Sequence, residues 1–182
     1  TSMAKVTLLT HTPDPERYIA AAAKLCYSAS GVDTLLDKLT DEKAAEFVEM
    51  LASMGHESPI EHVSFTFGIE GVSRSLLAQI TRHRIASFSV QSQRYVREKQ
   101  FSFVTPPEIE KDPETLAIYN QAMQNAIESY DALADRLKER HMAQLMAEGM
   151  EEKAARRQAE KMAIEDARFV LPNAADTNMI MT

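Results

Sequence analysis

The chain has 182 residues, of which 45% are hydrophobic and 26% charged, and its formal net charge is −7. This balance is typical of a globular domain long enough to bury a core, and it argues against a general nucleic-acid binder, which is usually basic. Cys26 is the single cysteine, which excludes an intrachain disulfide and a CxxC metal site. No apolar run approaches the roughly 20 residues that span a bilayer. We therefore expect one cytoplasmic domain over residues 1–182.

Hydrophobic spacing and turn residues divide the chain into alternating strands and helices. In chain order, the predicted elements are a strand over 4–10, helices over 12–28 and 39–56, a strand over 62–71, a helix over 73–84, extended segments over 89–96 and 101–106, helices over 113–149 and 151–171, and the start of a strand over 176–182. This order predicts a helix-rich α+β domain with long helices and a mixed or antiparallel sheet.

Three local expectations come from these helices. Thr40 is the expected N-cap of the second helix, because its hydroxyl can accept a backbone N–H of the first turn. Cys26 shares the apolar face of the first helix, so we expect a buried, small hydrophobic side chain. Gln79, Arg82 and His83 are spaced i, i+3, i+4 and should project from one face at the end of their helix.

Positive charge is concentrated in one window of this acidic chain. Residues 71–105 have a net charge of +5 (six Lys or Arg and one Glu), which leaves −12 for the rest of a chain of net −7. For Arg82, His83 and Arg84 alone, a solvated helix end is the simpler interpretation, since a helix C-terminus favours cations. Ser92 and Arg94 add a hydroxyl and a guanidinium fork on one side of an extended segment, which favours a phosphate ligand.

The usual catalytic signatures are not indicated. Ser92 has no local base and no G-x-S-x-G turn, so we predict a hydrogen-bond donor and not a nucleophile. The His- and Glu-rich segment 55–62 lacks the spacing that puts two His on one helical face, and Pro59 argues against a helix there. We predict a turn that leads into a strand, and no metal site. The chain has neither a Walker loop nor a GxGxxG motif.

Four ordered motifs resemble one family. The segment 82–95 reads RHR, seven residues, Ser and then QRY, which is similar to the signature of the flavin-dependent thymidylate synthases. GHESPIEH at 55–62 resembles the segment upstream of that signature, AAAKLCYS at 21–28 resembles an early helix end, and EDARFVLP at 165–172 resembles a later Arg-x-x-Leu-Pro segment. Four matches in order are far more specific than an isolated RHR.

The resemblance implies an α+β homotetramer with active sites between subunits. It also implies methylation of dUMP to dTMP, with FAD and NADPH as the reducing system and methylenetetrahydrofolate as the carbon donor. This agrees with the lack of a protein nucleophile, since the cofactor would supply the difficult chemistry.

Site residues carry over from the resemblance position by position. The positions for FAD are Ser58, Glu61, Arg82, His83 and Arg84; those for dUMP are Gln79, Arg82, Ser92, Gln93, Arg94 and Arg168; and His56 falls in the folate or nicotinamide region. Val90 stands where the family often has Gln or Glu, so a side-chain contact is not expected there. The family's activating Arg lies beyond Thr182, so the resemblance gives no catalytic side chain and predicts slow turnover by a chain that lacks the C-terminal segment.

The alternative is a non-catalytic nucleotide- or RNA-binding module that uses residues 82–99. Aromatic residues in and near that segment could stack on bases. They are Phe88, Tyr95, Phe101 and Phe103. The acidic remainder of the chain argues against this alternative, and a helical scaffold built on 113–170 would leave the basic segment unexplained.

Overall fold

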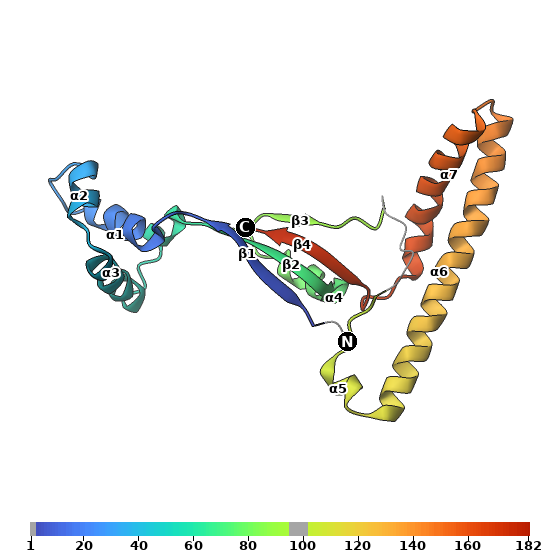
Figure 1. Cartoon of the computed structure of the whole chain (residues 1–182), viewed down its shortest axis with the longest axis horizontal. Coiled ribbons are helices and arrows are strands. Elements are labelled where there is room, and N and C mark those ends of the chain that lie inside the picture. Colours follow the sequence, from blue (N-terminus) through green and yellow to red (C-terminus); the bar gives the residue numbers. More distant parts are fainter. Residues whose placement is uncertain (1–2, 95–101) are drawn as a thin grey trace. The chain divides into compact units, whose positions relative to one another are not determined.

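The computed structural model describes residues 3–94 and 102–182 (Figure 1). The elements are β1 (Lys5–His11), α1 (Pro15–Leu25), α2 (Val32–Lys38), α3 (Asp41–Ser53), η1 (Ser58–His62), β2 (Phe65–Ser73), α4 (Arg74–Ile80), β3 (Phe88–Val90), α5 (Pro107–Glu110), α6 (Pro113–Ala147), α7 (Glu152–Ala167), η2 (Arg168–Val170) and β4 (Asp176–Met181). The strands form an antiparallel sheet in the order β1-β2-β4-β3. The prediction of a helix-rich α+β fold is confirmed.

The chain folds as two compact units. The N-terminal unit comprises Val6–Gly68 and Met181–Thr182, and the C-terminal unit comprises Thr1–Lys5 and Ile69–Ile180. The prediction of one domain over 1–182 stays a prediction. In the described part of the chain, no helix combines the length and the apolar character needed to cross a membrane.

The N-terminal unit is built around the apolar face of α1. Ile19, Ala20 and Ala23 are buried, and they pack against Leu39, just before α3, and Leu51 within it. The predicted cap of α3 is confirmed, because the Thr40 side chain accepts the backbone N–H of Lys43. This unit also contains α2, a seven-residue helix that the sequence did not predict.

Two expectations about the N-terminal unit were wrong. Cys26 is exposed: as the C-cap of α1 it keeps helical backbone dihedrals, but its side chain borders a hollow beside Ala23 and Phe47 and is not covered by a neighbouring element. Residues 58–62 form the short 3-10 helix η1 although they contain Pro59. Proline is tolerated here because it stands in the first turn, where its missing N–H would have no helical partner.

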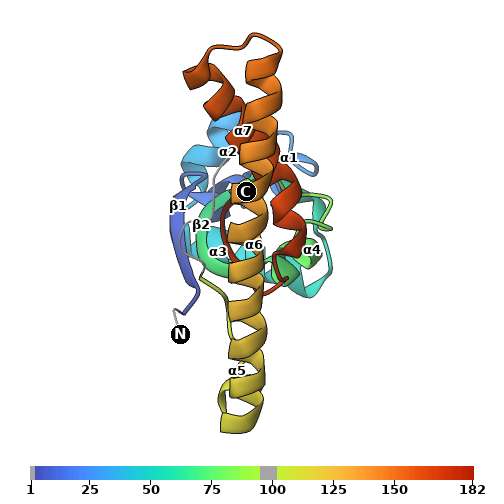
Figure 2. The same cartoon turned by 90° about the vertical axis from the view of Figure 1, so that its right-hand side faces the viewer.

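The C-terminal unit contains a helical hairpin of α6 and α7. Asp112 caps α6, since its carboxylate accepts the backbone N–H of Thr115 at 3.0 Å. α7 lies along the later part of α6 in both views (Figure 1 and Figure 2). Its contact face is a row of alanines, each at most 1% exposed, at intervals of four residues: Ala155, Ala159, Ala163 and Ala167. Small residues one turn apart let the two helices approach closely. This packing fixes the position of the C-terminal end of α7, and the predicted site residue Arg168 follows directly after it.

The basic triplet does not lie in a helix, contrary to expectation. α4 ends at Ile80, and the Thr81 hydroxyl donates to the Leu77 carbonyl at 2.8 Å. The same carbonyl accepts the backbone N–H of Thr81 at 3.2 Å, and the N–H groups of Arg82 and His83 then bond only three residues back, to Gln79 and Ile80, so the α-helical pattern stops there. Arg82, His83 and Arg84 therefore come after the helix, and the shared helical face predicted for Gln79, Arg82 and His83 was wrong.

Candidate functional site

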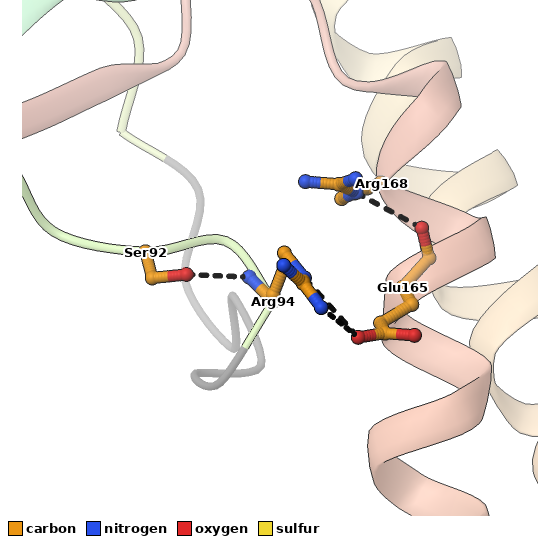
Figure 3. Close-up of polar contacts among 4 residues, drawn as sticks. All are labelled: Ser92, Arg94, Glu165 and Arg168. Carbon is orange, nitrogen blue, oxygen red and sulfur yellow. Dashed lines mark hydrogen bonds and ion pairs between the residues drawn. The ribbon is translucent and has the colours of Figure 1, made fainter.

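Three of the residues predicted to bind dUMP meet at the end of α7. We call Ser92, Arg94, Glu165 and Arg168 the Arg94 cluster (Figure 3). The Arg94 guanidinium donates from Nε and Nη2 to Oε1 of Glu165, at 3.1 and 2.9 Å. The backbone N–H of Arg94 donates to the Ser92 hydroxyl oxygen at 3.1 Å. One side chain of α7 therefore fixes the guanidinium of a residue that lies outside any regular element.

Glu165 holds the second arginine through its backbone. Nε of Arg168 donates to the Glu165 carbonyl at 3.0 Å, across three residues of the same chain segment. The Arg168 guanidinium also lies 5.7 Å from the centre of the Phe169 ring. Over residues 3–94 and 102–182, no hydrogen bond or ion pair uses the Nη atoms of Arg168. Figure 3 shows the Arg168 guanidinium near the Arg94–Glu165 pair, and guanidinium N–H groups are the donors that oxyanions accept from in proteins.

The segment that carries Ser92 and Arg94 is anchored by Gln91. Its backbone N–H donates to the Asn178 carbonyl of β4 at 3.0 Å, and its side-chain Oε1 accepts from Nδ2 of Asn178 at 3.3 Å. Nη2 of Arg74 donates to the Gln91 carbonyl at 3.0 Å. Three hydrogen bonds on the residue before Ser92 give the hydroxyl a defined position.

Asn178 also connects this anchor to β2. Its Oδ1 accepts the backbone N–H of Gly71 at 3.1 Å. Gly71 has φ = 69°, in the left-handed region that glycine adopts without a steric penalty. The amide of Asn178 thus joins Gly71 on one side of β4 to Gln91 on the other.

The basic triplet at 82–84 is not gathered in this way. Arg82, His83 and Arg84, which we call the RHR turn, are all exposed. Within the described residues their side chains make no hydrogen bond or ion pair, and nothing of that kind joins them to the Arg94 cluster. Gln79 is exposed in the last turn of α4, and Gln93 is partly buried in the turn before Arg94. The convergence of all the predicted residues on bound anions stays a prediction.

The remaining predicted site residues belong to the N-terminal unit. His56 and Ser58 line a hollow of about 310 Å³ together with Cys26 and Phe47. Glu61 lies in η1 and is exposed. No group of three His, Cys, Asp or Glu side chains that could hold a metal ion is found in residues 3–94 or 102–182. Of the basic and aromatic residues invoked for RNA binding, those numbered 95–101 lie outside the described residues.

Sequence reasoning missed three residues of the site. Glu165 stands in the EDARFVLP segment, but the resemblance assigns it no role. Arg74 was counted in the basic window without a role, and Asn178 lies in the last predicted strand. An acidic residue three positions before a predicted ligand-binding Arg is the one local signal, because side chains at i and i+3 share a helix face.

Comparison with known proteins identifies the family. Residues 7–182 match the family described as "Thymidylate synthase complementing protein". A flavin-dependent thymidylate synthase of Clostridium tetani is 54% identical over 178 residues, which cover 98% of this chain and 68% of the relative. The chain belongs to the flavin-dependent thymidylate synthase family. Another member, from Geobacter sulfurreducens, is 42% identical over 180 residues that cover 98% of this chain and 67% of its own length.

Solved structures show the same fold. A UMP/dUMP methylase of Streptomyces cacaoi, bound with 5-Br dUMP, superposes with a TM-score of 0.66 at 18% identity, covering 100% of this chain and 72% of that one. Thymidylate synthase X of Helicobacter pylori, with FAD and dUMP, gives a TM-score of 0.63 at 21% identity, covering 98% and 77%. At these identities the likeness is one of fold, and the functional assignment rests on membership of the flavin-dependent thymidylate synthase family.

Proposed function

We propose that this chain methylates dUMP to dTMP as a flavin-dependent thymidylate synthase, with the Arg94 cluster as its nucleotide phosphate site. The observation that carries the assignment is the meeting of Arg94 and Arg168 at one residue of α7, with the Ser92 hydroxyl beside them. The family signature assigns all three to dUMP, although the 92–94 segment and Arg168 are far apart in the sequence. A dianionic phosphate would find two guanidiniums and one hydroxyl in a single small region.

Each group has a distinct role in that site. Arg94 and Arg168 would neutralise the phosphate and orient it through planar N–H forks, which a lysine could not reproduce. The Ser92 oxygen accepts the backbone N–H of Arg94, and its own O–H remains available to donate to a phosphate oxygen. Binding of the phosphate fixes the nucleotide and thereby the position of its pyrimidine.

FAD fits the RHR turn on chemical grounds. Arg82 and Arg84 are exposed cations without an ion pair in the described part of the chain, and a flavin diphosphate would supply the missing anions. With His83 they are the residues of the C-terminal unit that we propose hold the cofactor, and the family resemblance adds Ser58 and Glu61 of the N-terminal unit, from this or another subunit. Bound FAD would accept hydride from NADPH and supply it for reduction of the transferred one-carbon unit.

The co-substrates and the assembly belong to the same proposal. Methylenetetrahydrofolate would provide the carbon and NADPH the reducing equivalents, with His56 in the region that receives one of them. His56 and Ser58 line one hollow of the N-terminal unit. We further propose a cytoplasmic homotetramer in which subunits complete one another's active sites.

Ligand binding tests the proposal directly. We expect the purified chain to take up FAD, seen as a yellow protein with flavin absorbance, and to bind dUMP more tightly than deoxyuridine by calorimetry. Tritium release from labelled dUMP should then require both NADPH and methylenetetrahydrofolate, with omission of each as the control. A folded chain that binds neither FAD nor dUMP, or that purifies with bound nucleic acid instead, would contradict the proposed function.

A further inference from the structure

The Arg94–Glu165 pair has the geometry of an anion bound to a guanidinium. Two N–H groups of Arg94, on Nε and Nη2, point at one carboxylate oxygen of Glu165. A phosphate oxygen is recognised by the same guanidinium donors at the same distances. The carboxylate therefore stands where the family signature would put an oxygen of the substrate.

The charges of the cluster make this position informative. Arg94 and Arg168 contribute +2, and Glu165 reduces the total to +1. A nucleotide monophosphate is close to a dianion at neutral pH. The charge of the two arginines balances that of the dianion only when the Glu165 carboxylate has moved away from Arg94. A carboxylate that stayed in place would repel the incoming phosphate.

The pair is built to be displaced. The side chains of Arg94 and Glu165 are 50% and 44% exposed. An exposed pair of this kind resists separation by at most about fivefold in an equilibrium constant. Arg94 lies in a turn after β3, and Glu165 lies 71 residues later on α7, so the ion pair can open without unwinding either helix or strand.

We propose that Glu165 is an internal counter-ion of the phosphate site: it occupies Arg94 in the absence of nucleotide and is displaced by the phosphate of dUMP. Glu165 is thus a positioning residue that acts through Arg94, and it lowers the affinity of the site for every phosphate-bearing ligand. Anions that make few other contacts, such as inorganic phosphate, bind weakly because they must displace the carboxylate from Arg94. A nucleotide makes further contacts that compensate for this displacement. The identity of that nucleotide rests on the proposed function, but competition between Glu165 and phosphate does not.

Removal of the carboxylate charge tests the inference. In Glu165→Gln we expect inorganic phosphate and dUMP to bind about three- to tenfold more tightly, because one competitor and one repulsive charge are removed. Deoxyuridine, which has no phosphate, should bind as in the parent. Glu165→Asp keeps the charge and should stay within about twofold of the parent for all three ligands. A merely structural defect would weaken binding, so the direction of change distinguishes the two roles.

Glu152→Gln is the matched control. Glu152 also pairs with an arginine on α7, since its Oε1 accepts from Nη2 of Arg156 at 3.0 Å, and both side chains are similarly exposed. This variant loses the same charge from the same helix and should bind phosphate as the parent does. Titration calorimetry of the four proteins with the three ligands completes the comparison, with circular dichroism to confirm that each is folded.

The outcomes separate this inference from the proposed function. Unchanged or weaker phosphate binding in Glu165→Gln overturns the counter-ion role, as does an equal gain for deoxyuridine or for Glu152→Gln. If phosphate binding tightens while dUMP shows no preference over phosphate in any protein, Glu165 is the counter-ion and the dUMP assignment is wrong. If no protein binds phosphate or dUMP, both ideas are overturned.

Discussion

The Arg94 cluster and the RHR turn come from one basic window of the sequence, yet the fold treats them differently. In the Arg94 cluster, two arginines are held by the carboxylate and the carbonyl of Glu165. In the RHR turn, the cations are exposed and make no ion pair within residues 3–94 and 102–182. The arginines of the Arg94 cluster are preorganised by contacts within the chain, whereas the cations of the RHR turn are exposed and make no such contact in the described residues. Local charge density alone does not distinguish these two states, because the partner of Arg94 comes from a distant helix.

The largest effect is expected from removing the open charges. Arg82→Ala combined with Arg84→Ala should weaken FAD binding by about 3 kcal/mol or more, since each hydrogen-bonded charge contributes about 1.5–3 kcal/mol. The free energy of unfolding should change by less than about 0.5 kcal/mol, because both side chains are exposed and make no hydrogen bond or ion pair within the described residues. Flavin fluorescence titration and urea denaturation measure the two quantities. The control removes Arg156 and Arg157 of α7, and equal loss of FAD affinity there would refute the assignment.

Arg94→Ala should reduce the affinity for dUMP by about 1.5–3 kcal/mol, the range for hydrogen bonds to a charged group. Loss of the Glu165 pair itself should lower the free energy of unfolding by no more than about 1 kcal/mol, because that pair is half-exposed. Arg94→Lys restores the charge without the planar fork and should recover only part of the affinity. Calorimetric titration with dUMP provides the measurement. Unaltered dUMP affinity in the alanine variant would contradict the proposal that Arg94 binds dUMP.

Asn178→Ala changes the hydrogen bonds that hold Gln91, the residue before Ser92, and leaves every residue of the Arg94 cluster and of the RHR turn unchanged. The change removes the side-chain hydrogen bonds to Gly71 and Gln91. With neutral hydrogen bonds at about 0.5–1.5 kcal/mol each, we expect dUMP affinity to fall by about 1 kcal/mol and FAD affinity to stay the same. Asn173→Ala is the control, because that side chain makes no hydrogen bond in the described part of the chain. An equal loss of affinity for dUMP and for FAD would mean that the Arg94 cluster and the RHR turn both depend on Asn178.

The smallest effect concerns the strand that carries Asn178. Burial raises the pKa of the Asp176 carboxyl at the start of β4. The native state therefore binds this proton more tightly than the unfolded chain does, and its stabilising contribution is complete below the unfolded-state pKa and lost as the pH rises through the native value. Asp176→Asn should be more stable than the parent at neutral pH by less than about 1 kcal/mol, given the partial exposure. The difference in unfolding free energy, measured by urea denaturation, should shrink on acidification, and a difference that grows instead would rule out this effect of burial.

Long periodic segments were predictable from the sequence. The helix expected over 113–149 is α6, Pro113–Ala147, because many turns of repeated apolar spacing identify it. The helices α2 and α5 were missed, since seven and four residues contain too few turns for a periodic signal. The predicted end of α4 lies too late because the change to hydrogen bonds three residues back, from Arg82 to Gln79 and from His83 to Ile80, leaves no trace in hydrophobic spacing.

The candidate site was predictable only in part. The four motifs led to Ser92, Arg94 and Arg168, which the structure brings together. Glu165 could not be paired with Arg94 from spacing, because 71 residues and several elements separate them. Helix periodicity predicts a buried Cys26, but periodicity gives only the direction of a side chain and not whether another element covers it, and Cys26 borders a hollow.

Gly71 limits which sequences this family fold can tolerate near its nucleotide site. A side chain at φ = 69° would raise the energy of the backbone by roughly 1–2 kcal/mol. Relief of that strain would turn the N–H away from Asn178, and the amide of Asn178 orients Gln91 immediately before Ser92. Random mutagenesis should therefore recover position 71 as intolerant in a screen for dUMP binding, even though glycine contributes no side chain to any ligand. Asparagine, which enters the left-handed region more readily than other residues, is the substitution we expect to survive most often.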